Sequence, residues 1–569
     1  MPAPGPDLVA ALTELRDAVG GLALGLDAEG ADDARKARDG AVHQTDDYLL
    51  PRLRSLDAPL LAVVGGSTGA GKSTLVNSVV GQQVTVAGVL RPTTRAPVLV
   101  CHPDDRRWFE DDRVLPGLAR QTGAGSAAGG ASTLQLVESA ELPAGLALLD
   151  APDIDSVVTA NRELASQLLA AADLWVFVTT AARYADAVPW DLLDQASRRS
   201  AAVAIVLDRV PPDAVAEVAA DLRRMLDEHG LGEAHLLRIA EGPLDAEGRL
   251  PEDQVAPVRS WLHELARDAD ARAEVIRSTL TGALADLERR VVALAGAAAD
   301  QERAAAGLRE VADDSYAAAV DDVGEQVRAG ALLRGEVLAR WQEFVGTGEL
   351  MRTIQARLGM VRDRIWSTVS GRPSSAEGVQ EAVEHGVEAL VHAAADRAAS
   401  RTVAAWRQQP GGRALVAGHE RELAKASPAL LARLPEEVRL WQGSVLALVR
   451  EQGADKRTSA RIASFTLNGA GLAVMLLVFA HTGGLTGAEF GVAAGTGVAS
   501  QKVLELLFGD QAVRALARDA RDDLLRRTGS VLALDEQRFH DLVDAVAPPA
   551  DPTPSAALRE QLDRWRAIR

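Results

Sequence analysis

Apolar residues follow different spacings in different parts of the chain. Over roughly the first 56 residues they recur at helical spacing, at Leu8, Leu12, Leu15 and Val19. Gly30 and Asp32 interrupt this pattern. We therefore predict two N-terminal helices separated by a turn.

From residue 60 the pattern changes to short apolar runs separated by amphipathic stretches. The runs span residues 60–64, 98–101, 146–149, 174–178, 203–207 and 236–239. Runs of this length, bounded by turn residues, are typical of buried strands in a mainly parallel sheet covered by helices. Residues 121–132 are rich in Gly, Ala and Ser and predict a surface loop within this region.

The strand-like runs stop after about residue 267. Residues 268–460 are rich in Ala, Leu, Glu and Arg and poor in Pro, which favours long helices packed as a bundle or stalk. Residues 462–488 contain no Asp, Glu, Lys or Arg, and helical spacing returns from 501 to about 545. Four prolines then predict a linker before a short terminal helix: Pro548, Pro549, Pro552 and Pro554.

These changes divide the chain into five predicted segments. They are N-terminal helices that pack with the stalk (1–56), an α/β domain (57–267), a helical bundle (268–461), an apolar segment (462–508) and C-terminal helices (509–569) with a proline-rich linker near 547–556. The predicted fold class is a mainly parallel α/β domain joined to a long all-α bundle.

Composition excludes several functional classes. The net charge of −19 argues against general nucleic-acid binding, because phosphates would be repelled. Cys101 is the only cysteine, so no internal disulfide can form, which fits a reducing compartment. The first seven residues lack the basic-then-apolar order of a signal peptide, so we expect a cytosolic protein. The ten histidines show no ligand-like clustering along the sequence, and we expect no zinc site.

A phosphate-binding motif directly follows the first apolar run. Gly66-x-x-x-x-Gly71-Lys72-Ser73 lies between the run at 60–64 and a predicted helix, which is the strand–loop–helix context of a P-loop. Glycines in such a loop let backbone N–H groups approach phosphate oxygens closely. The residues expected to bind a nucleoside triphosphate are Gly66, Ser67, Thr68, Gly69, Ala70, Gly71, Lys72, Ser73 and Thr74.

Two residues of this loop have expected chemical roles. Lys72 should reach the β- and γ-phosphates and neutralise charge that develops there, while the Ser73 hydroxyl should bind Mg²⁺. In the empty protein we expect Lys72 to be an exposed loop cation, so that its removal leaves the core intact.

Two further residues are candidate magnesium ligands. The run at 146–149 ends in Asp150, where P-loop proteins place a carboxylate that holds the metal, although an isolated strand-end aspartate is more often structural. Residues 91–97 contain Thr94, which we favour over Thr93 as a switch residue that offers its hydroxyl to Mg²⁺ and its N–H to the γ-phosphate. The alternative is a proline-containing turn that leads into the strand at 98–101.

The chain resembles the dynamin-like GTPase superfamily, specifically its bacterial members. The resemblance rests on the P-loop after a helical N-terminal segment, on Thr94-Arg95-x-Pro97 before a strand, and on a helical C-terminal half with an apolar segment near its end. Its motifs cover roughly residues 57–250. The resemblance implies GTP hydrolysis, nucleotide-controlled self-association, and remodelling or tethering of membranes.

Three positions depart from the family pattern. The third motif, usually Asp-x-x-Gly, reads Asp150-Ala-Pro-Asp153, so a carboxylate stands where the γ-phosphate would repel it, unless the side chain points away. The guanine-reading motif, usually Asn/Thr-Lys-x-Asp, reads Asp208-Arg209-Val-Pro211, so the fourth place has no carboxylate. Asp208 and Arg209 are the candidate base-side residues, and Asp208 or Asp213 could supply the missing carboxylate. Thr68 stands in place of the Gln that positions the attacking water in dynamins.

These observations leave three hypotheses. The leading one is a dynamin-like GTPase that uses Mg²⁺, with Lys72, Thr94 and Thr68 as catalytic candidates and Ser73, Thr94 and Asp150 as metal ligands. The missing guanine motif keeps open a P-loop ATPase of the same architecture. Asp153 and Thr68 keep open a slow or non-hydrolysing membrane scaffold gated by nucleotide.

The segment 462–508 is a candidate membrane hairpin. Residues 462–480 would reach about 28 Å as a helix, close to the thickness of the hydrocarbon layer. The return arm, 485–500, is weaker, with Glu489 near its start and many small residues. Basic residues precede the first arm at Lys456, Arg457 and Arg461 and follow the return arm at Lys502, so both ends should face the cytosol. We therefore expect a lipid membrane and other copies of the chain as partners, and a location at the cytoplasmic face of the cell membrane. The alternative is a helix buried within the bundle.

Overall fold

The protein is described by a computed structural model that covers residues 6–85, 96–111, 113–115, 117–122, 133–156, 159–199, 201–333, 339, 375–452 and 510–569. Its contacts divide it into two compact units. The first comprises residues 1–24, 30–299 and 550–569, and the second comprises residues 25–29 and 300–549. The predicted boundaries at 56 and 267 fall within the first unit.

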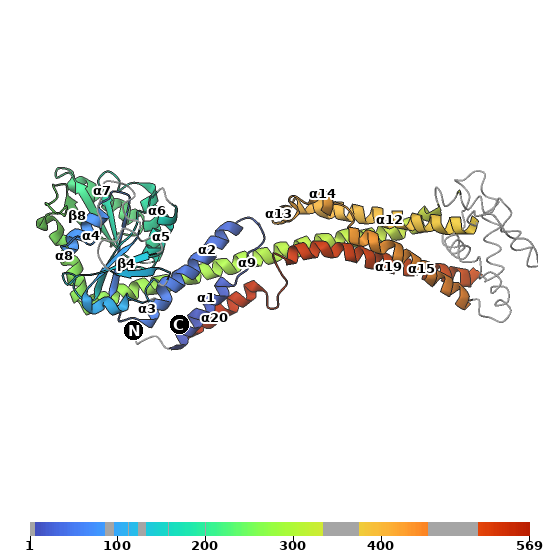
Figure 1. Cartoon of the computed structure of the whole chain (residues 1–569), viewed down its shortest axis with the longest axis horizontal. Coiled ribbons are helices and arrows are strands. Elements are labelled where there is room, and N and C mark those ends of the chain that lie inside the picture. Colours follow the sequence, from blue (N-terminus) through green and yellow to red (C-terminus); the bar gives the residue numbers. More distant parts are fainter. Residues whose placement is uncertain are drawn as a thin grey trace, which may run out of the picture. The chain divides into compact units, whose positions relative to one another are not determined.

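An eight-stranded sheet forms the centre of the first unit (Figure 1). Its order is β3-β4-β2-β5-β1-β6-β7-β8, and all neighbours are parallel except β2 and β5. The strands are β1 (Leu60–Gly66), β2 (Val98–Cys101), β3 (Ala119–Thr122), β4 (Thr133–Glu138), β5 (Leu146–Asp150), β6 (Leu174–Thr180), β7 (Ala202–Val210) and β8 (His235–Ala240). The mainly parallel sheet is confirmed, and each of the six predicted runs lies in a strand. Strands β3 and β4 were not predicted.

Helices cover both faces of this sheet. The helices are α4 (Lys72–Val80), α5 (Thr159–Ala170), α6 (Ala187–Arg198), α7 (Val215–Glu228) and α8 (Glu252–Arg267), with a 3₁₀ turn, η2 (Pro103–Trp108). Alternate residues of β1 enter different cores, because successive strand side chains point to opposite faces. Leu61 and Val63 pack in the core that contains residues of α5, α6 and α7, whereas Ala62 and Val64 pack in the core that contains residues of α4 and α8. This double burial explains the uninterrupted apolar runs.

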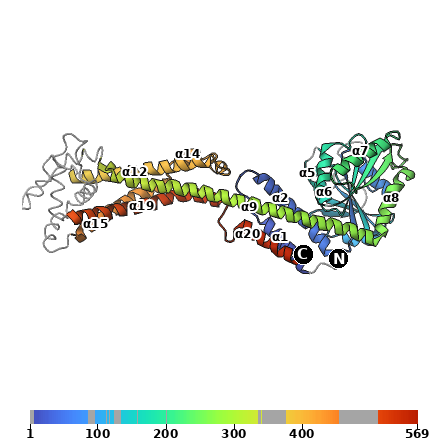
Figure 2. The ribbon, with the colours of Figure 1, turned by 180° about the vertical axis from the view of Figure 1, so that it is seen from behind.

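Both ends of the chain meet in a helical cluster of the first unit. Its elements are α1 (Pro6–Gly20), α2 (Ala31–Gln44), a π-helical turn η1 (Thr45–Leu49), α3 (Leu50–Arg54), the first part of α9 (Ala269–Arg328) and α20 (Pro554–Ile568). Helices α1 and α20 lie side by side (Figure 2). Leu15, Leu287 and Trp565 are buried together there, so the terminal helix is part of the folded unit rather than an appendage.

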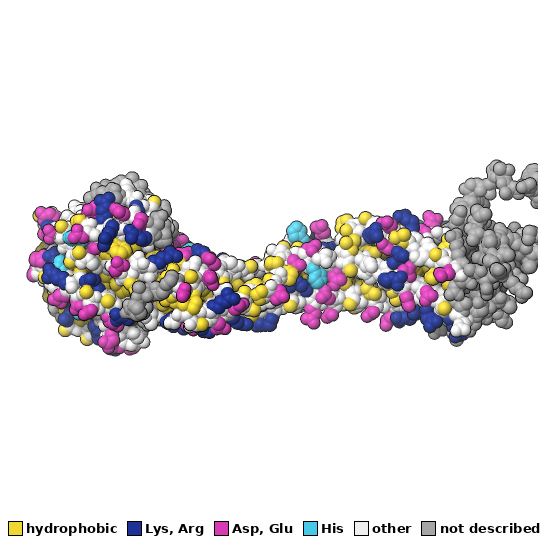
Figure 3. Space-filling view, turned by 90° about the horizontal axis from the view of Figure 1, so that it is seen from below, with side chains coloured by type: hydrophobic (Ala, Val, Ile, Leu, Met, Phe, Trp, Pro, Cys, Tyr) yellow, Lys and Arg dark blue, Asp and Glu magenta, His cyan; other side chains and the backbone are white. Residues whose placement is uncertain are grey.

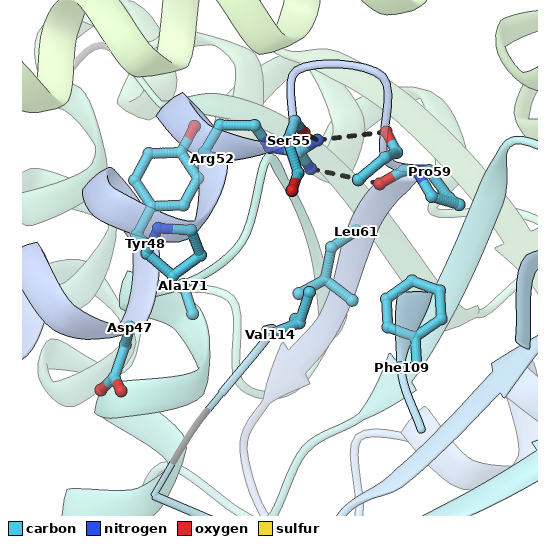
Figure 4. A pocket seen from close by; sticks show the side chains of 11 residues that line it. Asp47, Tyr48, Arg52, Ser55, Pro59, Leu61, Phe109, Val114 and Ala171 are labelled. Carbon is cyan, nitrogen blue, oxygen red and sulfur yellow. Dashed lines mark hydrogen bonds between the residues drawn. The ribbon is translucent and has the colours of Figure 1, made fainter. Parts of the chain in front are cut away.

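Arg52 fixes α3 to the amino end of β1. Its guanidinium donates to the carbonyl oxygens of Ala58 and Pro59, each at 3.1 Å (Figure 4). It also forms a buried ion pair with Asp173. Asp173 also accepts a hydrogen bond from the Leu61 amide at 2.8 Å. These contacts tie the end of α3 to the first residues of β1. The carboxyl end of β1 leads into the P-loop. The Arg52 contacts therefore anchor the amino end of the strand that positions the P-loop.

The second unit is helical. It contains the rest of α9, the 3₁₀ turn η3 (Ala331–Leu333), α12 (Ser375–Trp406), α13 (Gly412–Val416), α14 (Glu420–Leu423), α15 (Pro428–Gln452) and α19 (Asp510–Asp544). Trp406 and Trp441 are buried in one core, and their indole N–H groups donate to the carbonyl oxygens of Leu308 and Ala520 at 3.0 and 2.8 Å. The predicted helical bundle is confirmed. On the face that Figure 3 shows, acidic and basic side chains are interspersed.

One histidine of this unit lies beside two carboxylates. His540 Nε2 lies 2.8 Å from Asp313 Oδ1 on α9 and 3.8 Å from Glu536 Oε1 on its own helix, α19. The ligand atoms of the three residues all lie within 4.8 Å of one another. Because 227 residues separate Asp313 from His540, the sequence shows no sign of this grouping.

Several predicted features lie outside the described residues. They are the switch threonines Thr93 and Thr94, the loop residues 123–132, and the membrane-hairpin segment 462–508. Among the helices that the structure does describe, none combines the length and apolar character needed to cross a bilayer.

Candidate nucleotide-binding site

The P-loop connects the carboxyl end of β1 to the first residue of α4. Gly66 and Gly71 have φ angles of 150° and 100°, which side chains rarely adopt. A Cβ at Gly66 would also collide with the carbonyl oxygen of Val178, and a Cβ at Gly71 would lie 2.5 Å from Asp208 Oδ2. The glycines at these two positions are therefore required by the path of the loop, as the motif predicts.

Lys72 is buried inside this loop. Its Nζ donates to the carbonyl oxygens of Gly66 and Ser67 at 2.9 and 3.1 Å and pairs with Asp153 Oδ1 at 2.5 Å. Only 5 % of its side chain is exposed, so the expectation of an exposed loop cation is wrong. The loop folds around the ammonium group, and Asp153 supplies the negative charge that burial of a cation requires.

Asp153 therefore points toward the P-loop lysine rather than away from it. Its carboxylate is 21 % exposed and occupies a hydrogen-bonding position of Lys72. A γ-phosphate needs the same ammonium group. The carboxylate and a bound triphosphate consequently compete for one cation.

Ser73 and Asp150 meet beside Lys72 because β5 is hydrogen-bonded to β1, with Asp150 opposite Val64. The Ser73 hydroxyl donates to Asp150 Oδ2 at 2.6 Å. Asp150 is fully buried, and its Oδ1 has no hydrogen-bond partner among the described residues. Burial raises the pKa of Asp150, while the Ser73 hydrogen bond and the nearby charge of Lys72 act in the opposite direction.

This pair fits a magnesium ion. Mg²⁺ takes oxygen ligands, commonly one or two protein groups together with phosphate oxygens and water. A buried carboxylate with one unpaired oxygen, next to a hydroxyl at the start of α4, offers that donor set. Thr94, the third predicted ligand, lies outside the described residues.

Thr85 is a further neighbour of Asp150 that the sequence did not reveal. Its hydroxyl donates to Asp150 Oδ2 at 2.8 Å. Asn77 of α4 holds this threonine in place, because its side chain accepts from the Val84 and Thr85 amides and donates to the Thr85 carbonyl. The sequence shows Asn77 on the helix after the P-loop, but residue spacing does not reveal that it binds Thr85.

Thr68 is held by a carboxylate and an arginine. Asp155 Oδ1 accepts from the Thr68 amide at 2.6 Å and from its hydroxyl at 2.7 Å. Arg183 pairs with Asp155 Oδ2 at 2.7 Å and donates to the Thr68 carbonyl oxygen at 2.9 Å. Burial raises the pKa of Asp155, but the hydrogen bonds from Thr68 and Arg183 outweigh burial and leave the pKa lowered. Neither Asp155 nor Arg183 was identified from the sequence.

Asp208 and Arg209 lie against the outer side of the same loop. The Arg209 guanidinium donates to the Gly69 carbonyl oxygen, and Asp208 Oδ2 faces Gly71. Arg209 has a φ of 50°, and its amide donates to Asp208 Oδ1 at 2.8 Å. Burial raises the pKa of Asp208. Both predicted residues thus contact the P-loop, and their contact with a base stays a prediction.

The remaining predicted residues form the body of the loop. Ser67 and Ala70 are buried, and Thr74 lies in the first turn of α4, where its carbonyl oxygen accepts a hydrogen bond from the Ser78 hydroxyl. The structure therefore gathers at one edge of the sheet every predicted site residue that it describes. Asp153, Asp155, Arg183 and Thr85 join them there.

Residues 61–208, which extend from β1 into β7, match the sequence pattern that defines the dynamin family. The chain carries a dynamin-type G domain. The matched segment contains the P-loop, Asp150 and Arg183. Such a domain implies a nucleoside triphosphatase.

Solved structures provide weaker comparisons for the dynamin-type G domain and its helices. One is a structure described as an oligomerised bacterial dynamin pair that provides a mechanism for long-range sensing and tethering of membranes, with 11 % identity, a TM-score of 0.40 and 94 % of each chain covered. Another is Era of Aquifex aeolicus bound to GDP and AlF4⁻, with 18 % identity and a TM-score of 0.23; the match covers 36 % of this chain and 56 % of the Era chain. Among curated proteins, no sequence matches this chain.

Proposed function

We propose that this chain is a dynamin-like GTPase that binds and hydrolyses GTP with Mg²⁺ and couples its nucleotide state to self-association and membrane binding or remodelling. The observation that carries the proposal is the juxtaposition of Lys72, Ser73 and Asp150 in a dynamin-type G domain. These three residues supply the cation, the hydroxyl and the carboxylate that phosphoryl transfer requires.

In this mechanism the P-loop positions the triphosphate. Backbone N–H groups of the loop and the start of α4 bind phosphate oxygens, and Lys72 neutralises charge that develops on the β- and γ-phosphates. Ser73 and Asp150 would hold the Mg²⁺, with Thr94 as the proposed third ligand. When bound, Mg²⁺ acts as a Lewis acid that stabilises negative charge on the phosphate oxygens. Thr68 is the proposed residue for orienting the attacking water, because it stands in place of the Gln that does so in dynamins.

The membrane role is proposed for residues 462–508. Its first part, 462–488, contains no Asp, Glu, Lys or Arg, and Lys456, Arg457 and Arg461 precede it. Lys502 follows the weaker return arm, which contains Glu489, so basic residues at both ends suit a hairpin inserted from the cytosol. The many small residues of the return arm would let the two arms pack closely in lipid. The proposed location is therefore the cytoplasmic face of the cell membrane.

Vesicle flotation tests this coupling. Full-length protein and a variant lacking 462–508 are floated with anionic liposomes in the presence of a non-hydrolysable GTP analogue or GDP. Sedimentation under the same conditions reports self-association. We expect only the full-length chain to float and the analogue to increase both flotation and assembly. Equal flotation of the two proteins in both nucleotide states would contradict the membrane role.

Two other functions are favoured by single observations. Pro211 occupies the fourth place of the guanine motif, where a carboxylate would bind the base, which favours a P-loop ATPase of the same architecture. The pairing of Asp153 with Lys72 favours a slow or non-hydrolysing scaffold gated by nucleotide, because phosphate binding must break this ion pair. Nucleotide turnover distinguishes the three functions.

A further inference from the structure

A carboxylate occupies a phosphate-binding donor of the P-loop. The Thr68 amide belongs to the loop whose N–H groups bind phosphate oxygens in P-loop proteins. In this structure it donates to Asp155 Oδ1 at 2.6 Å, and the Thr68 hydroxyl donates to the same oxygen at 2.7 Å. Asp155 is 14 % exposed, so its carboxylate lies in the loop rather than in solvent. The Asp155 carboxylate therefore takes the place that a phosphate oxygen would take at the Thr68 amide.

Arg183 is the cation of this arrangement. Strand β6 is hydrogen-bonded to β1 along the register Ala62–Gly66, which places the segment after β6 beside the P-loop. From there Arg183 donates to the Thr68 carbonyl oxygen at 2.9 Å and pairs with Asp155 at 2.7 Å and with Asp186 at 2.9 Å. All of these contacts are separate from the Lys72–Asp153 pair.

A γ-phosphate and Asp155 cannot both use these donors. Asp155 is held ionised by its hydrogen bonds, since its pKa is lowered, so protonation does not relieve the repulsion at neutral pH. Arg183, in contrast, can exchange one of its partners. Its planar guanidinium presents several donors, so it can keep the Thr68 carbonyl and Asp186 while the nitrogen that binds Asp155 takes another oxyanion.

We propose that the γ-phosphate of a bound triphosphate displaces Asp155 from Thr68 and Arg183, so that Arg183 becomes a phosphate-binding cation supplied by the chain itself. The inference rests on the proposed function and deepens it. Arginines that reach the transferred phosphate, whether from the same chain or from a partner, stabilise its charge and accelerate phosphoryl transfer. Asp186 is the residue that holds Arg183 at the loop during this exchange of partners.

The test compares triphosphate with diphosphate. Dissociation constants for a non-hydrolysable GTP analogue and for GDP, and single-turnover rates with GTP, are measured for the wild type, Arg183→Ala, Arg183→Lys and Asp155→Asn. Arg564→Ala is the matched control, because it removes an exposed arginine of α20 paired with Glu560. Thermal melting of each variant without nucleotide reports structural damage separately.

Each variant has a distinct expected result. Arg183→Ala should weaken analogue binding about tenfold, lower the single-turnover rate at least about a hundredfold and leave GDP binding unchanged, with Arg183→Lys intermediate. Asp155→Asn should tighten analogue binding about tenfold without tightening GDP binding, because a competing charge is removed. Arg564→Ala should match the wild type.

Two results would overturn the inference in distinguishable ways. Equal losses of analogue and GDP binding in Arg183→Ala, with wild-type nucleotide binding intact, would make Arg183 a structural support of the loop and leave the proposed function standing. Failure of the wild type itself to bind the analogue or an ATP analogue would remove the proposed function, and the inference with it.

Discussion

Lys72 Nζ and Asp153 Oδ1 lie 2.5 Å apart in the P-loop of a dynamin-type G domain. The family pattern has glycine where this chain has Asp153, so the ion pair exists only because aspartate replaces that glycine. The pair neutralises a lysine whose side chain is only 5 % exposed. A bound triphosphate would have to take over that cation, which links nucleotide affinity to a single carboxylate.

Asp153→Asn should therefore tighten nucleotide binding. The amide keeps the size of the side chain but removes the charge that competes with phosphate, and we expect the dissociation constant to fall about tenfold. Titration with a fluorescent GTP analogue measures this, and Asp33→Asn, an exposed surface aspartate on α2, is the control. Weaker binding in Asp153→Asn would mean that the carboxylate supports the bound state.

Lys72→Ala should have the opposite effect. It removes the charge-assisted contacts to phosphate, and we expect binding to weaken by about a hundredfold or more. Because Asp153 would lose its partner, the variant should also melt slightly below the wild type, while keeping its helical circular dichroism. Lys36→Ala, which removes an exposed lysine paired with Asp33, is the matched control. Wild-type affinity in Lys72→Ala would refute the P-loop assignment.

Asp150→Asn should raise the magnesium requirement of the protein. Asparagine is similar in size to the fully buried aspartate and still offers one oxygen as a hydrogen-bond acceptor. It removes the negative charge that would bind the cation. We expect at least about tenfold more Mg²⁺ for half-maximal binding of the GTP analogue, measured by titrating Mg²⁺ at fixed nucleotide. An unchanged magnesium requirement would show that Asp150 has only a structural role.

The group formed by Asp313, Glu536 and His540 should make the helical unit less stable at higher pH. Burial, followed by the hydrogen bond and repulsion from Asp313, raises the pKa of Glu536 from 4.5 to about 7. Between these two values the folded state holds a proton that the unfolded state releases, so stability falls as pH rises through this window. Glu536→Gln should remove part of this loss.

The measurement is the melting temperature at about pH 5 and about pH 8. Relative to wild type, Glu536→Gln should gain stability at the higher pH, where the wild type carries a half-buried negative charge beside Asp313. An identical pH dependence in both proteins would show that Glu536 titrates normally in the folded state.

Much of the architecture could be predicted because burial on both faces produces uninterrupted apolar runs. The runs that became β1, β5 and β6 are buried throughout, and each was visible in the sequence. Strand β3, Ala119–Thr122, is short, contains Arg120 and Gln121, and forms the edge of the sheet, so it lacked that signal. Strand β4 carries Gln135 and Glu138 among its apolar residues and was missed for the same reason.

The candidate site was only partly visible in the sequence. The motif around Lys72 and the strand-end Asp150 follow from local spacing. Asp155 and Arg183 do not, because Asp155 lies 87 residues from Thr68 and 28 residues from Arg183. Only the strand order, which places β6 next to β1, brings these side chains together. The roles of Thr94 and of 462–508 stay predictions, since both lie outside the described residues.

The most direct test of the central claim is steady-state hydrolysis of GTP and ATP by the full chain with Mg²⁺, with Lys72→Ala as the blank. The account predicts that GTP is hydrolysed with a higher kcat/KM than ATP, but by less than about a hundredfold, because Pro211 leaves the base edge without its usual carboxylate. Lys72→Ala should show no turnover. A higher kcat/KM for ATP, or turnover of neither nucleotide above the Lys72→Ala blank, would contradict the assignment as a GTPase.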